Sequence, residues 1–195
     1  AAKGDFGRGR MLMPFEVAKK AIDFLIEKSE GRHNLEVDFF GGEPLMNFEV
    51  VKQVVNYARS IEKKHNKNFR FTITTNGLLL TDDKIDFINK EMSNCVLSLD
   101  RRRVRVDGTG CDQQIVPKFQ KLVSERGDKD YYARGTFTKY NLDFTNDVQH
   151  MVDLGFEQVS VEPVVSDINL DYSIKKEDLP RVFEEYERLA KTIIH

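Results

Sequence analysis

The sequence alternates between short β-strand patterns and amphipathic helix patterns along its whole length. Five apolar runs typical of buried strands are each followed by residues with helical spacing, and one more helical pattern precedes the first run. The expected strands cover residues 35–40, 69–76, 95–100, 131–138 and 157–165. The expected helices cover residues 13–28, 48–65, 115–125, 147–154 and 178–194, with a further helix after Thr81. Because such alternation is built from right-handed strand–helix–strand crossovers, the sequence predicts an α/β fold with a parallel sheet.

The periodicity leaves the architecture of that sheet open, because an open doubly wound sheet and a barrel use the same unit. The chain begins with a helical pattern, whereas a helix in such a fold normally follows a strand. We therefore expect a first strand and its loop to lie before Ala1, and residues 1–195 to form one incomplete domain. Asn47 and Thr81 are expected to cap the two helices that follow them.

Charge and cysteine content exclude several classes of protein. The 195 residues include 30 Lys and Arg against 32 Asp and Glu, a net charge of −2, which argues against a nucleic-acid partner. No apolar run is long enough for a membrane span and no secretory leader precedes the first helix, so we expect a cytoplasmic protein without a membrane partner. The two cysteines form no CxxC or CxxxCxxC set, and Cys95 opens an apolar strand as an expected buried, inert thiol. No residue of the chain is expected to bind a metal.

Small, polar and charged residues follow the carboxyl end of every expected strand, which is where ligands bind in parallel α/β folds. These strand-end motifs are Gly41-Gly42-Glu43-Pro44, Thr74-Thr75-Asn76-Gly77, Ser98-Leu99-Asp100, Arg134-Gly135-Thr136 and Val161-Glu162-Pro163. Any one of them is equally well explained as a turn. The five together favour a site for a polar small molecule.

The side chains at these ends indicate which chemical groups such a molecule carries. The carboxylate of Glu43 suits an ammonium group, and the planar fork of Arg134 suits a carboxylate. Ser98 and Asp100 are two residues apart on one strand and would suit a ribose diol. Apolar residues around Pro163 would flank a flat heterocycle. A nucleoside with an amino-acid tail satisfies all four groups, whereas GxGxxG, P-loop and GxSxG motifs are missing from the sequence.

Five segments in order resemble the radical S-adenosylmethionine (SAM) superfamily, and within it the peptide-modifying maturases. They are FFGGEPLMNF (39–48), TTNG (74–77), SLD (98–100), RGTFT (134–138) and SVEPV (160–164). Residues 11–190 look most like the thioether-forming, SPASM-type maturases of Cys-rich SCIFF peptides. The resemblance implies a partial (β/α)6 TIM-like barrel and a radical SAM oxidoreductase.

The resemblance also implies roles for single residues. Gly41, Gly42 and Glu43 would hold the methionyl ammonium of SAM, Ser98 and Arg134 its carboxylate, Asn76 or Asp100 its ribose and tail, and the backbone of Val161, Glu162 and Pro163 its adenine. Family members carry a [4Fe-4S] cluster on a CxxxCxxC loop that precedes the segment matched here, and an auxiliary-cluster domain at the carboxyl end. The implied partners are a Cys-rich precursor peptide and a reductant protein. The isolated chain is expected to be inactive, and no catalytic residue is identified.

One segment departs from the family pattern. Asp100 is followed by Arg101 where the family has Gly, and the connection over residues 101–114 looks shortened or altered. Two other interpretations stay open. A sulfatase-type formylglycine maturase shares the GGEP and SLD segments, and a noncatalytic nucleoside-binding scaffold of flavodoxin-like type would explain the strand ends as ordinary turns.

Overall fold

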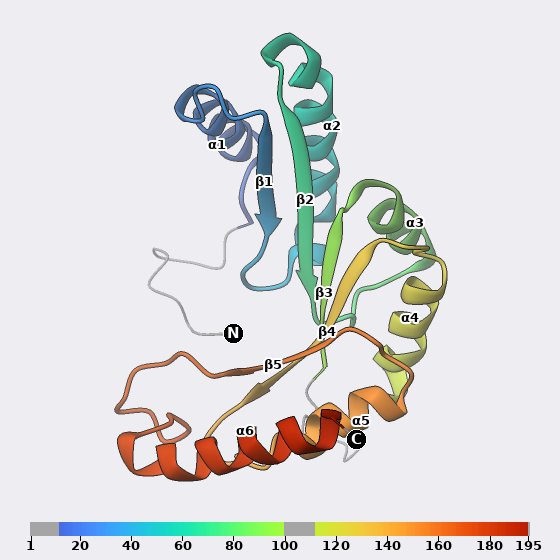
Figure 1. Cartoon of the computed structure of the whole chain (residues 1–195). Helices are drawn as coiled ribbons and strands as arrows, with labels where there is room; N and C mark the ends of the chain where they lie inside the picture. The colour runs from blue at the N-terminus through green and yellow to red at the C-terminus, as the bar shows by residue number, and fades with distance from the viewer. Residues whose placement is uncertain (1–11, 100–111, 195) are drawn as a thin grey trace. The chain divides into compact units, whose positions relative to one another are not determined.

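The computed structural model describes residues 12–99 and 112–194, in which six α-helices alternate with five strands (Figure 1). The helices are α1 (Phe15–Lys28), α2 (Phe48–His65), α3 (Asp82–Glu91), α4 (Asp112–Ser124), α5 (Thr145–Asp153) and α6 (Leu179–Ile194). The strands are β1 (Asn34–Phe39), β2 (Asn68–Thr75), β3 (Asn94–Ser98), β4 (Asp130–Phe137) and β5 (Val159–Pro163). Two short 3-10 helices, η1 (Pro44–Asn47) and η2 (Lys176–Asp178), precede α2 and α6. The predicted alternation is confirmed.

The five strands form one sheet in the order β1-β2-β3-β4-β5. The register of β1 with β2 and of β4 with β5 is parallel, so the predicted α/β class is confirmed. Every strand neighbours the next one in the chain, and the order never reverses. Doubly wound sheets contain such a reversal at the point where they bind ligands, whereas barrels do not. The winding is therefore that of a barrel, which argues against the flavodoxin-like alternative.

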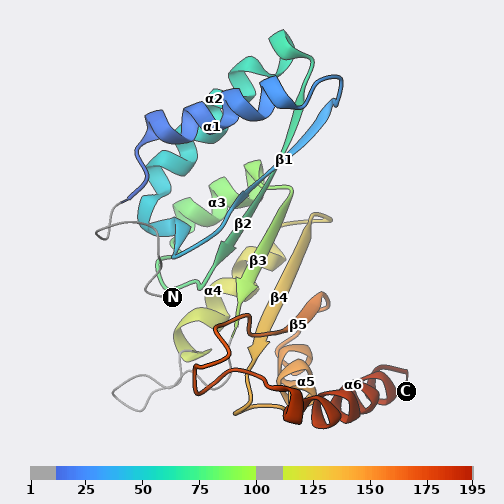
Figure 2. The ribbon, with the colours of Figure 1, turned by 90° about the vertical axis from the view of Figure 1, so that its left-hand side faces the viewer.

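The chain divides into two compact units. Unit 1 comprises Ala1–Val96 and Leu122–Tyr131, and unit 2 comprises Leu97–Lys121 and Tyr132–His195. In unit 1, Phe69, Phe71 and Ile73 alternate along β2 and are completely buried, as expected for a strand covered by helices. Val55 and Ala58 contribute the buried face of α2, which lies beside α1 (Figure 2). The alternating apolar residues of β2 therefore build the core of this unit.

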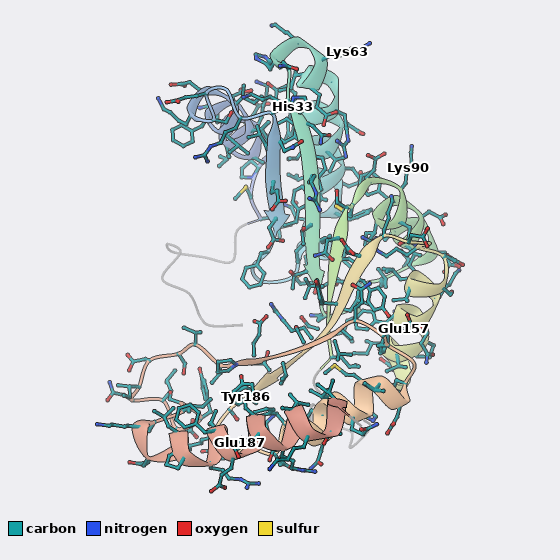
Figure 3. All side chains as sticks on the ribbon, in the orientation of Figure 1. His33, Lys63, Lys90, Glu157, Tyr186 and Glu187 are labelled. Carbon is teal, nitrogen blue, oxygen red and sulfur yellow. The ribbon has the colours of Figure 1, made fainter. Side chains whose placement is uncertain are left out.

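The core of unit 2 gathers where β4 ends. The stacked rings of Phe137 and Phe144 lie 4.3 Å apart between centroids, and Val182 of α6 completes the cluster. Tyr186, labelled in Figure 3, contributes its ring from the same helix at 4.8 Å from Phe144. Glu185 is fully buried and accepts a hydrogen bond at 3.0 Å from the backbone N of Thr145, the first residue of α5. This carboxylate joins α6 to the amino end of α5.

The capping expectations were wrong. Asn47 stands at the N-cap position of α2 but makes no capping bond, because its amide donates to the Met13 carbonyl at 2.9 Å. Thr81 stands at the N-cap position of α3, yet its hydroxyl donates to the Asp83 carboxylate at 2.6 Å instead of accepting a backbone N–H.

Some residues of interest lie outside the described part of the chain, namely Asp100, the basic run 101–105, Cys111 and His195. No helix in the described part is long and apolar enough to cross a lipid bilayer.

Candidate functional site

The turn after β1 requires both of its glycines. Gly41 has φ +91° and Gly42 has φ +56°, in the left-handed region that side chains disfavour. A Cβ added at either position would meet no atom within 4 Å. The glycines are therefore needed for backbone conformation rather than for space. They reverse the chain so that Glu43, at the start of η1, faces the end of β2.

Glu43 braces the ends of β1 and β2. Its Oε1 accepts hydrogen bonds from the Thr75 hydroxyl at 2.8 Å and the Leu45 backbone N at 3.1 Å. Its Oε2 accepts a third from the Asn76 backbone N at 2.8 Å. A carboxylate offers about four acceptor positions, so these three bonds leave capacity for one ligand donor. The sequence assigned Glu43 to a ligand ammonium and missed this brace, although Thr75-Asn76 at the next strand end was a usable signal.

Asn76 shapes the turn that follows β2. Its side-chain Oδ1 accepts a hydrogen bond from the Leu78 backbone N at 3.0 Å, and the neighbouring Thr75 hydroxyl accepts one from Gly77 N at 3.1 Å. These are the local side-chain bonds typical of Asx and ST turns. Gly41, Gly42, Glu43 and Asn76 thus come together in unit 1, at the carboxyl ends of two paired strands.

Ser98 and Arg134, both expected to bind a ligand carboxylate, lie on neighbouring strands of unit 2. Ser98 is the last residue of β3, and the backbone N of the next residue, Leu99, donates to the Arg134 carbonyl at 2.9 Å. Ser98 is half-buried, and 22% of the Arg134 side chain is exposed. A hydroxyl and a guanidinium on adjacent strands can both donate to a carboxylate.

Arg134 has a carboxylate neighbour that the sequence did not predict. Its Nη1 lies 3.7 Å from Oε2 of Glu162, whose side chain is 57% exposed. In the parallel register Arg134 faces Ser160 and Thr136 faces Glu162, so the ion pair is a diagonal across β4 and β5. A ligand carboxylate at Arg134 would share the guanidinium with Glu162. The two residues were expected to contact different parts of one ligand.

The end of β5 divides its residues between the core and solvent. Val161 is half-buried and packs against the cluster of Phe137, Phe144 and Val182. Glu162 and Pro163 are exposed. The Val161 side chain is therefore engaged in the core, whereas Glu162 and Pro163 are open to solvent.

Cys95 is a buried thiol in β3, as predicted. Burial raises its pKa to about 11, and the charge of Arg126 only partly opposes this shift. The thiol is therefore protonated near neutral pH, whereas a metal ligand must be a thiolate. In residues 12–99 and 112–194, no three His, Cys, Asp or Glu side chains are grouped so that they could hold a metal ion.

Comparisons with known proteins gave one family and several solved structures. A family model described as a 4Fe-4S single cluster domain matches residues 5–114, more than half of the chain. A structure of native anSMEcpe with bound AdoMet and a Kp18Cys peptide has a TM-score of 0.75 at 16% identity, covering 91% of this chain and 52% of that chain. A domain of pyruvate-formate lyase-activating enzyme from Bacteroides vulgatus has a TM-score of 0.54 at 14% identity, covering 79% of this chain and 94% of that chain.

A second structure of native anSMEcpe, with bound AdoMet, has a TM-score of 0.71 at 15% identity and covers 95% of this chain and 54% of that chain. No curated protein matches the sequence. The chain thus spans about half the length of the anSMEcpe structures. At these identities the likeness establishes the fold, an α/β partial barrel of the radical SAM type.

Proposed function

Because the chain belongs to the 4Fe-4S single cluster domain family, we propose that it is the SAM-binding core of a radical SAM enzyme that modifies a peptide. The observation that carries this proposal lies in unit 1, where Glu43 and Asn76 stand at the carboxyl ends of the paired strands β1 and β2. In unit 2, Arg134 and Ser98 offer donors on two neighbouring strands. The anSMEcpe structures support it, because they share the fold and contain AdoMet, in one case with a peptide.

The residues present fit SAM and do not fit a [4Fe-4S] cluster. Glu43 keeps one acceptor position for an ammonium, and Arg134 with Ser98 offers donors for a carboxylate. Clusters of this type are held by cysteine thiolates, but the sequence contains two cysteines and one of them is the buried Cys95. The described residues therefore include groups that suit SAM, and among them no three His, Cys, Asp or Glu side chains are grouped so that they could hold iron.

Each group has a defined task in binding. Glu43 and the glycine backbone before it would hold the methionyl ammonium, and Ser98 with Arg134 would hold the carboxylate. Asn76, or Asp100 outside the described residues, would address the ribose and tail. The backbone of Val161, Glu162 and Pro163 would flank the adenine. SAM supplies the chemistry that removes hydrogen from a substrate, and the protein binds, orients and shields it.

For the substrate, we propose a Cys-rich precursor peptide in which thioether cross-links form, with a separate reductant protein as partner. The support is the resemblance of residues 11–190 to SPASM-type thioether maturases. The likeness to the sulfatase maturase anSMEcpe favours a second candidate, oxidation of a peptide Cys or Ser to formylglycine. Mass spectrometry of the product separates the two when the modified residue is a Cys. Thioether formation removes hydrogen and keeps sulfur, whereas formylglycine formation from Cys replaces sulfur by oxygen.

Calorimetric titration of SAM into the purified chain tests the binding proposal. Arg134→Gln removes a charge-assisted contact worth about 1.5–3 kcal/mol, so we expect SAM to bind roughly 10- to 100-fold more weakly. Glu43→Gln is expected to weaken SAM binding as well. The matched control is Arg70→Gln, at an exposed Arg of β2 that pairs with Glu36 at 3.6 Å. Equal affinities in all four proteins would contradict the proposal and favour a noncatalytic scaffold.

A further inference from the structure

A cluster of side-chain hydrogen bonds holds the chain together just beyond the end of β4. Asn141 Oδ1 accepts hydrogen bonds from the backbone N of Thr138 at 2.8 Å and from its hydroxyl at 2.9 Å. Asn141 Nδ2 donates to the Thr136 carbonyl at 3.4 Å and to Asp147 Oδ2 at 3.3 Å. One amide therefore ties the last residues of β4 to the turn after it and to the first turn of α5. We call Thr136, Thr138, Asn141 and Asp147 the β4 clamp.

The acid in this clamp is unusual. Asp147 is 8% exposed, and its Oδ1 is buried with no hydrogen-bond partner in the described part of the chain. Its other oxygen accepts from Asn141, its one partner among residues 12–99 and 112–194. Its place in the first turn of α5 lets the helix dipole offset part of the cost of burying a carboxylate. A buried acceptor without a partner still costs free energy, so a contribution to stability does not explain why an acid stands here.

The clamp acts on the strand that carries Arg134. Thr136 lies two residues beyond Arg134, so both side chains stand on the same face of β4. In the register with β5, Thr136 faces Glu162, the partner of Arg134 in the ion pair. β4 and α5 are also in contact, because a Cβ at Gly135 would lie 3.5 Å from Cε of Met151, an ordinary van der Waals distance. A shift of the clamp would therefore move the strand segment that sets the direction of the Arg134 guanidinium.

We propose that Asn141 and Asp147 are positioning residues that hold β4 so that Arg134 meets the carboxylate of a bound SAM. This inference rests on the proposed function. Neither residue contacts the ligand. They act through Thr138, which follows β4 and donates twice to Asn141 Oδ1, while the bond to Asp147 holds that amide in place. Misplacement of a binding group by about 1 Å can cost orders of magnitude in function, so loss of the clamp has a measurable effect on affinity.

The test exchanges the two side chains of the pair. Asn141→Asp puts an oxygen where Nδ2 donates, so two carboxylates face each other at the 3.3 Å contact. The double variant Asn141→Asp with Asp147→Asn restores the bond between residues 141 and 147 with its direction reversed, and Oδ1 of residue 141 still accepts from Thr138. Only the longer 3.4 Å bond to the Thr136 carbonyl is not restored. The matched control is Gln149→Glu, the same change on the exposed face of α5, where Gln149 donates to Asp153 at 2.8 Å.

Affinity is measured by calorimetry for SAM and for decarboxylated SAM, with thermal unfolding as a check of the fold. Asn141→Asp should weaken SAM binding about tenfold and leave decarboxylated SAM nearly unchanged, because only SAM uses Arg134. The double variant should return to within about threefold of the unmodified chain, and Gln149→Glu should bind both ligands normally. If Asn141→Asp does not fold, Asp147→Ala removes the same acceptor without added charge and should show the same selective loss.

Three outcomes would overturn the inference. The inference is contradicted if Asn141→Asp binds SAM normally. It is also contradicted if this variant binds SAM and decarboxylated SAM with equally reduced affinity, because that result indicates a purely structural role. A double variant that stays as weak as the single variant also contradicts it, because the pair then does not act as a unit. An unmodified chain that does not bind SAM refutes the proposed function itself, and the positioning role falls with it.

Discussion

Replacing Glu43 by Gln tests the brace between β1 and β2. The carboxylate accepts three hydrogen bonds, one on Oε2 from the Asn76 backbone N and two on Oε1. Gln has the same shape but only one acceptor atom. With its amide nitrogen in the Oε2 position, the substituted side chain would point a donor at the N–H of Asn76, and the flipped amide would oppose the Leu45 N–H instead. Either orientation loses at least one bond and leaves a donor facing a donor.

The magnitude follows from the number and kind of these bonds. A hydrogen bond to a charged group contributes about 1.5–3 kcal/mol, and Glu43 is only partly buried, so the lower part of that range applies. We expect the free energy of unfolding to fall by about 2 kcal/mol. For a chain of this length such a loss lowers Tm by roughly 4–8 °C.

Urea unfolding followed by circular dichroism measures the loss. The matched control is Glu36→Gln in β1, where the Glu36 side chain is 74% exposed and lies 3.6 Å from Arg70. Removing such an exposed pair should change the free energy of unfolding by less than about 0.5 kcal/mol. Hydrogen exchange at the Asn76 amide should also become faster in Glu43→Gln. If Glu43→Gln and Glu36→Gln are equally stable, the brace does not connect the two strands in the way described.

Three other predictions concern the scaffold. In a Cys111→Ser variant, iodoacetamide at pH 8 should label the buried Cys95 far more slowly in the folded than in the unfolded chain, and equal labelling rates would contradict the burial. Because the pKa of this thiol is higher in the folded chain, the free energy of unfolding should fall by roughly 2–3 kcal/mol as pH rises from about 9 to 11. Gly41→Ala, at φ +91°, should cost about 1–2 kcal/mol, whereas Gly135→Ala should be tolerated because its Cβ meets only ordinary contacts; similar urea midpoints would refute the strain argument. Arg126→Leu should cost about 3 kcal/mol in chemical unfolding, since the buried guanidinium donates to two backbone carbonyls and one side-chain amide; a loss below about 1 kcal/mol would show that these acceptors find other partners.

Local periodicity predicted the elements well because helix and strand patterns are properties of neighbouring residues. The helix expected over residues 48–65 has those bounds in the structure, and the other elements differ by a few residues at their ends. The caps were mispredicted for a tertiary reason. The Asn47 side chain donates to the carbonyl of Met13, 34 residues away, and no local sequence pattern predicts such a long-range bond. The order of the strands was likewise undetermined until the structure paired each strand with the next.

The sequence predicted where the candidate site residues lie, but it did not predict the contacts that they make with one another. The sequence located Glu43 and Arg134 at strand ends because turn residues follow apolar runs. It did not reveal that Glu43 accepts from Thr75 or that Arg134 pairs with Glu162, because both contacts depend on the parallel register of two strands. The buried carboxylate of Asp147 was also missed, since a polar residue in a helical first turn normally indicates exposure.

The central claim is that Arg134 binds the carboxylate of SAM, and a thermodynamic cycle tests it most directly. The dissociation constants of SAM and decarboxylated SAM are measured for the unmodified chain and for Arg134→Gln by calorimetry. We predict that removing the carboxylate weakens binding at least about tenfold more in the unmodified chain than in Arg134→Gln, where Ser98 alone still donates to it, a coupling of roughly 1.4 kcal/mol or more. Equal losses in the two proteins, with no coupling, would contradict the claim.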